Sequence, residues 1–381
     1  MAIVGLGFLI LAHEFGHFIV AKATGMRVEE FSLGFGPFLV SRRIGETVYG
    51  VSAVPLGGYV RVTGMHKEEF DARVAEAREL EAEEQVEKAK RRPQDPEDRL
   101  AGKRALSADE IAATPLAKRY YAHPFWHKLV FIIAGVTMNM IVAFLLIWAV
   151  GASQGEVISS TLISEVEAGT PAAAAGIKAG DRIVSIDGKK TDTWQDVHTE
   201  ILTKPGETVA IVVERDGAER ELTATIGRQD DGTGRLGIMS TTEVRELGVI
   251  DAFGYAGKKT GSMVALIFKG IGMMFTGAAP VTGSQGLAGP VGIIQLSSEA
   301  YQGGYYLMLL ALISINLAIL NMLPLLPLDG GHVLFSIIER IRGRNVSLRV
   351  FERISLVGLA IFVLLFIVAT SNDIGRLFSS G

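Results

Sequence analysis

The chain has 381 residues, of which 49% are hydrophobic and only 20% are charged, and this composition favours a membrane protein. The net charge of -4 argues against a nucleic-acid-binding protein, which needs a basic surface to meet phosphates. The absence of cysteine excludes disulfides, thiolate metal sites and cysteine nucleophiles.

Four stretches of the chain are apolar over the roughly 20 residues that a helix needs to cross a bilayer. Three of them contain no charged residue and no histidine, and the first is interrupted only by His13, Glu14 and His17. Buried helices of a soluble protein are the alternative, but such helices rarely run this long without charge. We predict a polytopic α-helical membrane protein with transmembrane helices at 1–23, 128–151, 305–328 and 354–372.

The basic residues between these helices predict how the chain is oriented. Residues 24–127 and 329–353 are rich in lysine and arginine, which are enriched in cytoplasmic loops. The segment 151–304 also carries basic residues, but it is long enough to be a domain, to which the rule does not apply. We therefore expect both termini and 151–304 on the extracytoplasmic side, with 329–353 as a cytoplasmic loop.

The first cytoplasmic segment has two parts of different character. Residues 24–65 contain short β-prone runs punctuated by glycine and proline, which predict hairpins in a membrane-associated β region. Residues 66–127 form a charged insertion and linker: 66–92 has the composition of a solvated helix with intrahelical ion pairs, and a flexible linker follows to about Thr114. A solvated spacer is favoured over a partner-binding role for this insertion.

The first predicted helix carries the sequence HEFGH at residues 13–17, an HExxH motif. Residues four apart share one face of a helix, so the imidazoles of His13 and His17 can reach a single metal ion. Glu14 lies beside them and can take a proton from a metal-bound water. Ionisable groups inside a membrane span cost a few kcal/mol each, so these three residues are functional candidates.

Catalytic zinc usually has three protein ligands and one open position, so a third ligand is expected elsewhere in the chain. The candidates are Asp329, His332 and His66. Asp329 is favoured, because it follows the third span at the depth of the HExxH motif, and an isolated carboxylate there would need a cation. His332 is expected to be interfacial or supporting, and His66 has no supporting context.

The surroundings of Asp329 leave a second interpretation open. Gly330 and Gly331 permit a tight turn, and Pro324 and Pro327 interrupt the helix before it. Asp329 would also suit the N-cap of a helix starting near Val333, and the two roles are compatible.

The extracytoplasmic segment contains a predicted domain at 155–230. Residues 169–188 resemble the short helix, turn and strand of the PDZ domains of bacterial proteases. A helix is expected at 194–202, and the alternation of 208–214 and 221–226 predicts strands. Residues 249–304 follow as an amphipathic segment on the membrane surface, and a fifth span at 260–280 is disfavoured because it would invert the topology and bury a lysine.

Together these features resemble the site-2 protease family of intramembrane zinc metalloproteases, in particular its bacterial regulator-of-sigma-E type, here with a single PDZ domain. The likeness covers nearly the whole chain. It is carried by HExxH in the first span and by an Asn-x-x-Pro-x-x-x-Leu-Asp-Gly pattern at 321–330. A Gly-x-x-x-Asn pattern at 135–139 also matches, although Val136 stands where the family usually has proline.

The resemblance implies a role for each matching residue. His13, His17 and Asp329 would bind Zn²⁺ and Glu14 would be the catalytic base. The remaining matches, expected to support the site or hold the substrate's unwound backbone, are Asn139, Asn321 and Gly330.

The resemblance also implies partners and a location. The substrates would be single-pass membrane helices, such as pre-cleaved anti-sigma factors or signal-peptide remnants, cut within a bacterial inner membrane by an active site towards the cytoplasm. The PDZ domain is favoured as a size filter over a binder of chain ends. A non-catalytic membrane scaffold and a metal transporter are the rival interpretations, but neither gives a use to Glu14.

Overall fold

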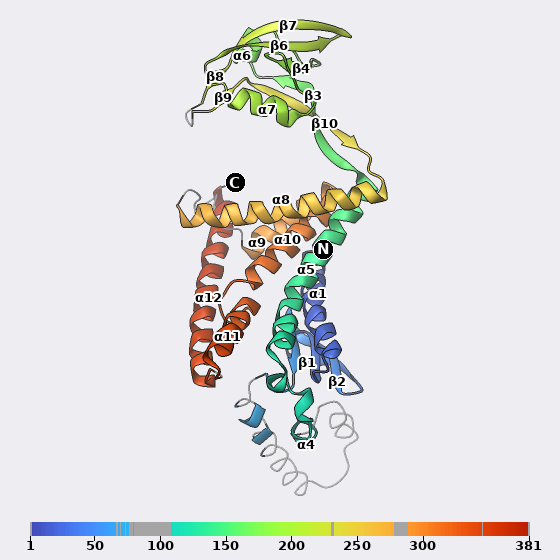
Figure 1. The fold of residues 1–381 in the computed structure, drawn as a ribbon, viewed down its shortest axis with the longest axis vertical. Coiled ribbons are helices and arrows are strands. Elements are labelled where there is room, and N and C mark those ends of the chain that lie inside the picture. The colour runs from blue at the N-terminus through green and yellow to red at the C-terminus, as the bar shows by residue number, and fades with distance from the viewer. Residues whose placement is uncertain are drawn as a thin grey trace. The chain divides into compact units, whose positions relative to one another are not determined.

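The computed structural model describes residues 2–65, 68, 70–72, 74–75, 79, 108–229, 232–277, 289–344 and 346–379. The chain forms two compact units, one made of residues 1–148 and 256–381 and the other of residues 149–255. Figure 1 shows the first as a group of helices with a small sheet and the second as a sheet with short helices.

Three helices in the described part of the chain are long and apolar enough to cross a membrane. They are α1 (Ala2–Ala23), α5 (Phe125–Gln154) and α12 (Leu348–Ser379). They coincide with the first, second and fourth predicted spans, although α5 and α12 run beyond the predicted bounds. Only 11% of the most apolar stretch of α12 is buried, so most of its apolar side chains face outwards, as in a helix that contacts lipid.

The third predicted span is not one continuous helix. Helix α10 (Tyr306–Asn321) has 16 residues and is about 24 Å long at roughly 1.5 Å per residue, short of a bilayer core of about 30 Å. The apolar sequence continues to Leu328, but Pro324 and Pro327 cannot extend the helix. The count of four spans therefore stays a prediction.

Helix α11 (Asp329–Arg342) occupies most of the segment that the sequence predicted to be a loop. Its last turn carries Arg340 and Arg342, whose positive charges interact favourably with the negative end of the helix dipole. Gly343 ends it in the left-handed conformation, with φ of 66°.

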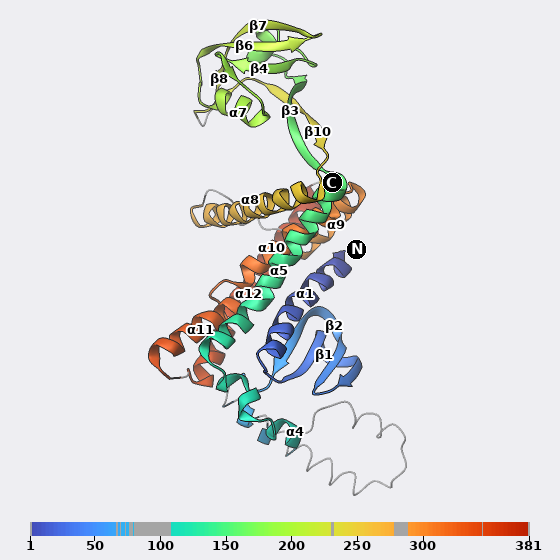
Figure 2. The same cartoon turned by 45° about the vertical axis from the view of Figure 1, so that its right-hand side comes forward.

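A two-stranded sheet of β1 (Val28–Ile44) and β2 (Thr47–Val62) follows α1, as the hairpin prediction for 24–65 required. The strands are long and bent, so that residues 30–33 pair with 48–51 on one side and with 58–61 on the other. Figure 2 shows this sheet beside α1, and α1 contacts both strands.

The linker prediction for the stretch up to Thr114 is wrong at its end, where the chain is folded. Helix α4 (Ala108–Ala112) and the 3₁₀ turns η1 (Leu116–Lys118) and η2 (Tyr120–Ala122) lead into α5. The buried Arg27 donates to the Glu110 carbonyl and to Thr114, and Arg43 forms two hydrogen bonds with the Glu110 carboxylate. Most of the predicted solvated helix at 66–92 lies outside the described residues.

The second unit is built on a sheet with the strand order β10-β3-β4-β6-β7, and β5 pairs with β4. The strands of the second unit are β3 (Glu156–Val166), β4 (Arg182–Ile186), β5 (Lys189–Lys190), β6 (Thr208–Arg215), β7 (Ala218–Thr225), β8 (Gly227–Arg228), β9 (Gly234–Arg235) and β10 (Ile238–Arg245), of which β8 and β9 pair only with each other. Its helices are α6 (Pro171–Ala174) and α7 (Trp194–Leu202).

The predicted helix at 194–202 and the predicted strands of this unit are confirmed, but the predicted boundary at 230 is too early. Strand β10 pairs with β3 and forms one edge of the sheet. The pairing joins residues about 80 positions apart, for example Thr242 with Ser159, so local sequence patterns did not indicate it. Helix α7 begins as its sequence dictates, because Thr193 and Asp196 form a capping box.

Two further helices, α8 (Val249–Phe275) and α9 (Pro290–Gln302), follow the second sheet. Helix α8 exposes Val249, Ile250 and Phe253, and its lysines fit the predicted amphipathic helix. It is not among the three candidate spans, so nothing in the described residues favours the fifth span.

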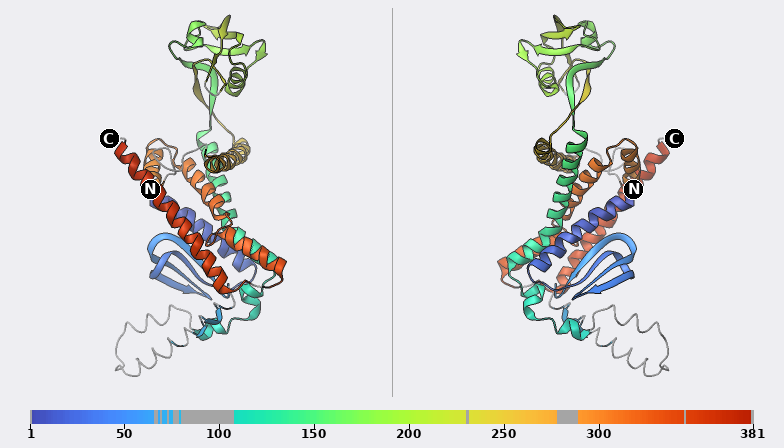
Figure 3. Two further views of the ribbon diagram at one scale, coloured as in Figure 1. Left: turned by 90° about the vertical axis from the view of Figure 1, so that its left-hand side faces the viewer. Right: turned by 90° about the vertical axis from the view of Figure 1, so that its right-hand side faces the viewer.

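Helix α9 is tied to α12 through a buried carboxylate. Figure 3 shows α9 near the C-terminal end of α12. Asp373 of α12 is 2% exposed and accepts hydrogen bonds from the backbone N–H groups of Gly289 and Gly292. It thereby satisfies the N-terminal N–H groups of α9, which the apolar surroundings would otherwise leave without partners.

Candidate metal centre

Helix α1 presents His13 and His17 on one face, and both side chains are buried. This face lies against α5, where the two backbones approach closely because residue 16 is glycine. A Cβ atom on Gly16 would be 2.8 Å from the carbonyl carbon of Ala134 and closer still to its oxygen. The glycine inside the HExxH motif therefore allows the histidines to reach the interior of the helix group.

Asp329 joins the two histidines from the start of α11, more than 300 residues along the chain. Its Oδ2 atom lies 3.1 Å from His13 Nε2 and 3.4 Å from His17 Nε2. The two Nε2 atoms are 3.3 Å apart. Within the described residues this is the one group of three histidine or acidic side chains arranged to hold a metal ion.

These separations fit a zinc ion. Ligand atoms about 2.0–2.1 Å from a tetrahedral zinc lie roughly 3.3–3.4 Å from one another, and the three observed separations are 3.1, 3.3 and 3.4 Å. Asp329 Oδ2 is buried and has no hydrogen-bond partner among the described residues, although two ring nitrogens lie near it. Such a carboxylate oxygen needs a cation, and three ligands leave the fourth position open.

Gly135 of α5 keeps the space in front of the imidazoles clear. A Cβ atom at this position would lie 2.7 Å from His13 Nε2 and closer still to His17 Nε2. No side chain fits there beside a metal ion. The sequence showed Gly135 only as part of a family pattern, and its function becomes clear from the packing of α5 on α1.

The other ring nitrogens of the two histidines face α5. His17 Nδ1 lies 2.8 Å from the Phe131 carbonyl oxygen, to which it donates a hydrogen bond. This leaves the Nε2 lone pair for a metal. His13 Nδ1 lies 3.3 Å from the side-chain nitrogen of Asn139, which is fully buried. A carbonyl partner such as that of Phe131 has no sequence signature, so sequence reasoning missed it.

Glu14 faces the sheet rather than α5. A Cβ atom on Gly58 of β2 would be 3.1 Å from Glu14 Cγ, so the strand passes close to the glutamate. The candidate base therefore lies between the histidines of α1 and strand β2.

Gly330 allows Asp329 to approach the site. A Cβ atom on Gly330 would overlap the carbonyl oxygens of Met322 and Leu323, so the turn after α10 packs directly on the start of α11. The N-cap of α11 is Leu328, and Asp329 is its first residue, so the prediction of Asp329 as N-cap of a helix near Val333 is wrong.

The remaining predicted residues lie outside the histidine–aspartate group. Asn321 is the last residue of α10 and is half-buried, and its side chain makes no hydrogen bond within the described part of the chain. The ring of His332 packs against that of Phe351 at a tilt, with ring centroids 5.4 Å apart. His66 lies outside the described residues.

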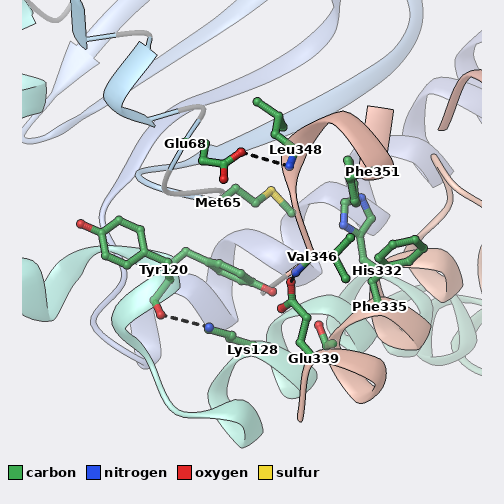
Figure 4. Close-up of a pocket in the computed structure, with 12 residues that line it drawn as sticks. Met65, Glu68, Tyr120, Lys128, His332, Phe335, Glu339, Val346, Leu348 and Phe351 are labelled. Carbon is green, nitrogen blue, oxygen red and sulfur yellow. Dashed lines mark hydrogen bonds between the residues drawn. The ribbon is translucent and has the colours of Figure 1, made fainter. Parts of the chain in front are cut away.

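His332 and Phe351 line a cavity of about 230 Å³ in the first unit, as Figure 4 shows. Tyr120 also lines this cavity, and its ring packs against that of Phe131, which in turn packs against His17. The rings of Tyr120 and Phe131 therefore lie between the cavity and the candidate metal ligands.

The chain is similar to known proteins over most of its length. The model of peptidase family M50 matches residues 1–365. The zinc metalloprotease RasP of Shouchella clausii is 31% identical, with 97% of each chain covered. The regulator of sigma-W protease RasP of Bacillus subtilis is 29% identical, with 99% of this chain and 98% of that protein covered.

One structural comparison covers a smaller part of the chain. The crystal structure of the PDZ domain of an SdrC-like protein from Listeria monocytogenes is 26% identical and covers 22% of this chain and 86% of that structure, with a TM-score of 0.20. The family model matches most of the chain, and the relatives are zinc metalloproteases: the chain belongs to peptidase family M50, the site-2 type of zinc metalloprotease.

Proposed function

We propose that this integral membrane protein hydrolyses peptide bonds within the transmembrane segments of other membrane proteins. The observation that carries the proposal is the convergence of His13, His17 and Asp329 to within 3.4 Å, inside a group of apolar helices. These three residues would hold the zinc ion, and Glu14 lies next to them in the sequence.

Glu14 is the residue that we assign as general base. Bound zinc supplies a Lewis acid that lowers the pKa of water and polarises a carbonyl oxygen. Glu14 takes a proton from the attacking water and passes it to the leaving amide nitrogen. Strand β2 passes close to its side chain at Gly58 and limits where the carboxylate can lie.

The substrate must leave its helix before water can attack it, and its freed backbone groups then need partners. The strand edge at residues 58–62 lies beside Glu14 and can pair with an extended segment. The side-chain amide of Asn321, which makes no hydrogen bond within the described residues, is a second partner for such a segment. Phe35, Leu39 and Val40 of the sheet are exposed, which suits membrane association of this element.

The substrates that we propose are single-pass helices, such as pre-cleaved anti-sigma factors or signal-peptide remnants. The Bacillus subtilis relative is a regulator of sigma-W protease, which supports the first class. We place the protein in a bacterial inner membrane with both termini outside, because residues 329–353 and 24–127 carry the basic residues expected in the cytoplasm.

The second unit is assigned as an extracytoplasmic PDZ domain that excludes substrates with bulky outside domains. A second role, binding of an extended peptide, is favoured by a groove of about 190 Å³ between α7 and residues 234–239. Its apolar lining includes Trp194, Ile201 and Leu236.

Substitution of Glu14 by glutamine tests the proposed reaction. Glu14→Gln should abolish cleavage of a model transmembrane substrate in detergent or liposomes while about one zinc per chain remains, because the three ligands are intact. Glu299→Gln, an exposed position on α9, is the matched control and should cleave at the rate of the unchanged protein. Cleavage that survives Glu14→Gln would reject this assignment, and a change in zinc flux instead would favour a transporter.

A further inference from the structure

Asn139 occupies a position that the proposed reaction does not explain. It is fully buried on α5, and its side-chain nitrogen lies 3.3 Å from His13 Nδ1. Its side-chain oxygen is buried and has no hydrogen-bond partner in the part of the chain that the structure describes. Buried amides normally have their polar atoms hydrogen-bonded, so the unpartnered oxygen raises the question of which amide atom faces His13.

The metal site decides which atom of the amide must face His13. His13 Nε2 is the nitrogen that points to His17 and Asp329, so it needs a lone pair to bind a metal. In a neutral imidazole the proton then resides on Nδ1, which becomes a donor. An amide N–H₂ group opposite this donor would repel it, whereas the amide oxygen would accept from it.

The nitrogen and oxygen of an asparagine amide have nearly the same shape, and a half-turn about the last side-chain bond exchanges them. This half-turn places Oδ1 on His13 Nδ1–H and gives the buried oxygen the partner that it lacks. We propose that Asn139 is a positioning residue for the zinc site: its Oδ1 accepts the hydrogen bond from His13 Nδ1 and fixes the tautomer and orientation of that imidazole.

The same stripe of α5 supports both histidines. Phe131, Gly135 and Asn139 are spaced four residues apart, so they lie on one face of the helix. The Phe131 carbonyl accepts from His17, Gly135 leaves room for the metal, and Asn139 accepts from His13. Hydrogen-bond acceptors on the second ring nitrogen are the usual means of orienting histidines that bind zinc.

A third helix fixes Asn139 itself. Ser314 of α10 is fully buried, and its hydroxyl donates a 2.8 Å hydrogen bond to the backbone carbonyl of Asn139. The turn of α5 that carries the amide is therefore held from α10 while its side chain reaches α1. With its backbone held in this way, Asn139 can orient the imidazole of His13.

The test compares two substitutions of Asn139 by their effect on zinc affinity. Asn139→Asp keeps an oxygen opposite His13 Nδ1, and Asn139→Leu removes it at similar volume. Zinc dissociation constants are measured by chelator competition on the detergent-purified full chain, with Asn372→Leu, another buried asparagine, as the matched control. The spectrum of the Co²⁺-substituted protein reports the ligand geometry independently of activity.

We expect Asn139→Leu to weaken zinc binding about 10- to 100-fold, with an altered Co²⁺ spectrum. Asn139→Asp and Asn372→Leu should stay within about threefold of the unchanged protein. Equal losses in both Asn139 variants would overturn the proposal, because they would show a donor or a purely structural role. Unchanged affinity in Asn139→Leu would overturn it as well.

This inference rests on the proposed zinc site, and the same measurement separates the two. If the unchanged protein bound no zinc, both the proposed function and the role of Asn139 would fail. If the unchanged protein bound zinc and the variants behaved contrary to expectation, only the role of Asn139 would fail.

Discussion

At the scale of single residues, the proposed metal site depends on glycine as well as on its ligands, because a side chain at Gly135 would occupy the space beside the imidazoles. Gly135→Ala would place a methyl group 2.7 Å from His13 Nε2 and closer to His17 Nε2, in the space that the metal needs. We expect zinc affinity and cleavage rate to fall by about 100-fold or more, because one imidazole must move away.

Gly7→Ala is the control for this prediction. Gly7 is also a helix glycine, but a Cβ atom there meets nothing within 4 Å. Alanine should leave zinc binding unchanged and stabilise α1 by about 0.5–1 kcal/mol. Equal zinc affinity in Gly135→Ala and Gly7→Ala, measured by chelator competition, would contradict the packing argument.

Asp181 gives the second unit a dependence on pH. Burial alone would raise the pKa of its carboxyl group, but the hydrogen bonds from Arg215 and from the Lys178 backbone N–H lower the pKa overall. A lowered folded-state pKa means that the stabilisation is complete above the ordinary carboxyl pKa. It is lost as the pH falls through the folded-state value.

We therefore expect the second unit to be equally stable above about pH 5 and progressively less stable below it. Asp181→Asn should cost about 2 kcal/mol at neutral pH and flatten this acid dependence. Hydrogen exchange of the β4 amides in the full-length protein measures both effects. Asp192→Asn, an exposed position, should show neither.

At the scale of elements, α12 supports the turn that delivers Asp329. A Cβ atom on Gly358 would be 2.9 Å from the carbonyl carbon of Leu326 and would overlap its oxygen. Gly358→Ala should therefore push this turn away and reduce zinc affinity about tenfold, although residue 358 touches no metal ligand. Gly375→Ala, on the same helix with open space around it, is the control.

The sequence predicted most elements of the fold but misjudged where several end. The apolar run at 305–328 predicted one helix, yet α10 stops at Asn321, because hydrophobicity reports the membrane environment and prolines decide the backbone. The start of helix α11 was misplaced: the alternative interpretation began a helix near Val333, whereas the observed helix begins at Asp329 and includes Gly330 and Gly331. Strand β10 was missed because its partner is far away in the sequence.

At the scale of the whole molecule, the second unit is proposed to restrict which substrates reach the site. A chain lacking residues 155–245 should cleave a substrate that still carries a folded outside domain at least about tenfold faster than the full chain does. Cleavage of a pre-shortened substrate should change little and serves as the control. If both substrates lost cleavage, the unit would instead be needed for binding or folding.

The residues proposed to bind the metal could be identified from the sequence, but their arrangement in space could not. The HExxH spacing fixed which two histidines share a face, and a carboxylate inside an apolar segment required a cation, so His13, His17 and Asp329 were identifiable as a set. Both arguments depend on local geometry and solvation, which sequence determines directly.

Only the tertiary structure placed α11 beside α1, with the three ligand atoms 3.1–3.4 Å apart. It also decided that Gly135 clears space for the metal and that the Phe131 carbonyl orients His17. These relations join residues more than 100 positions apart and involve backbone atoms that every residue possesses. No sequence pattern records them, because they arise from how the helices pack.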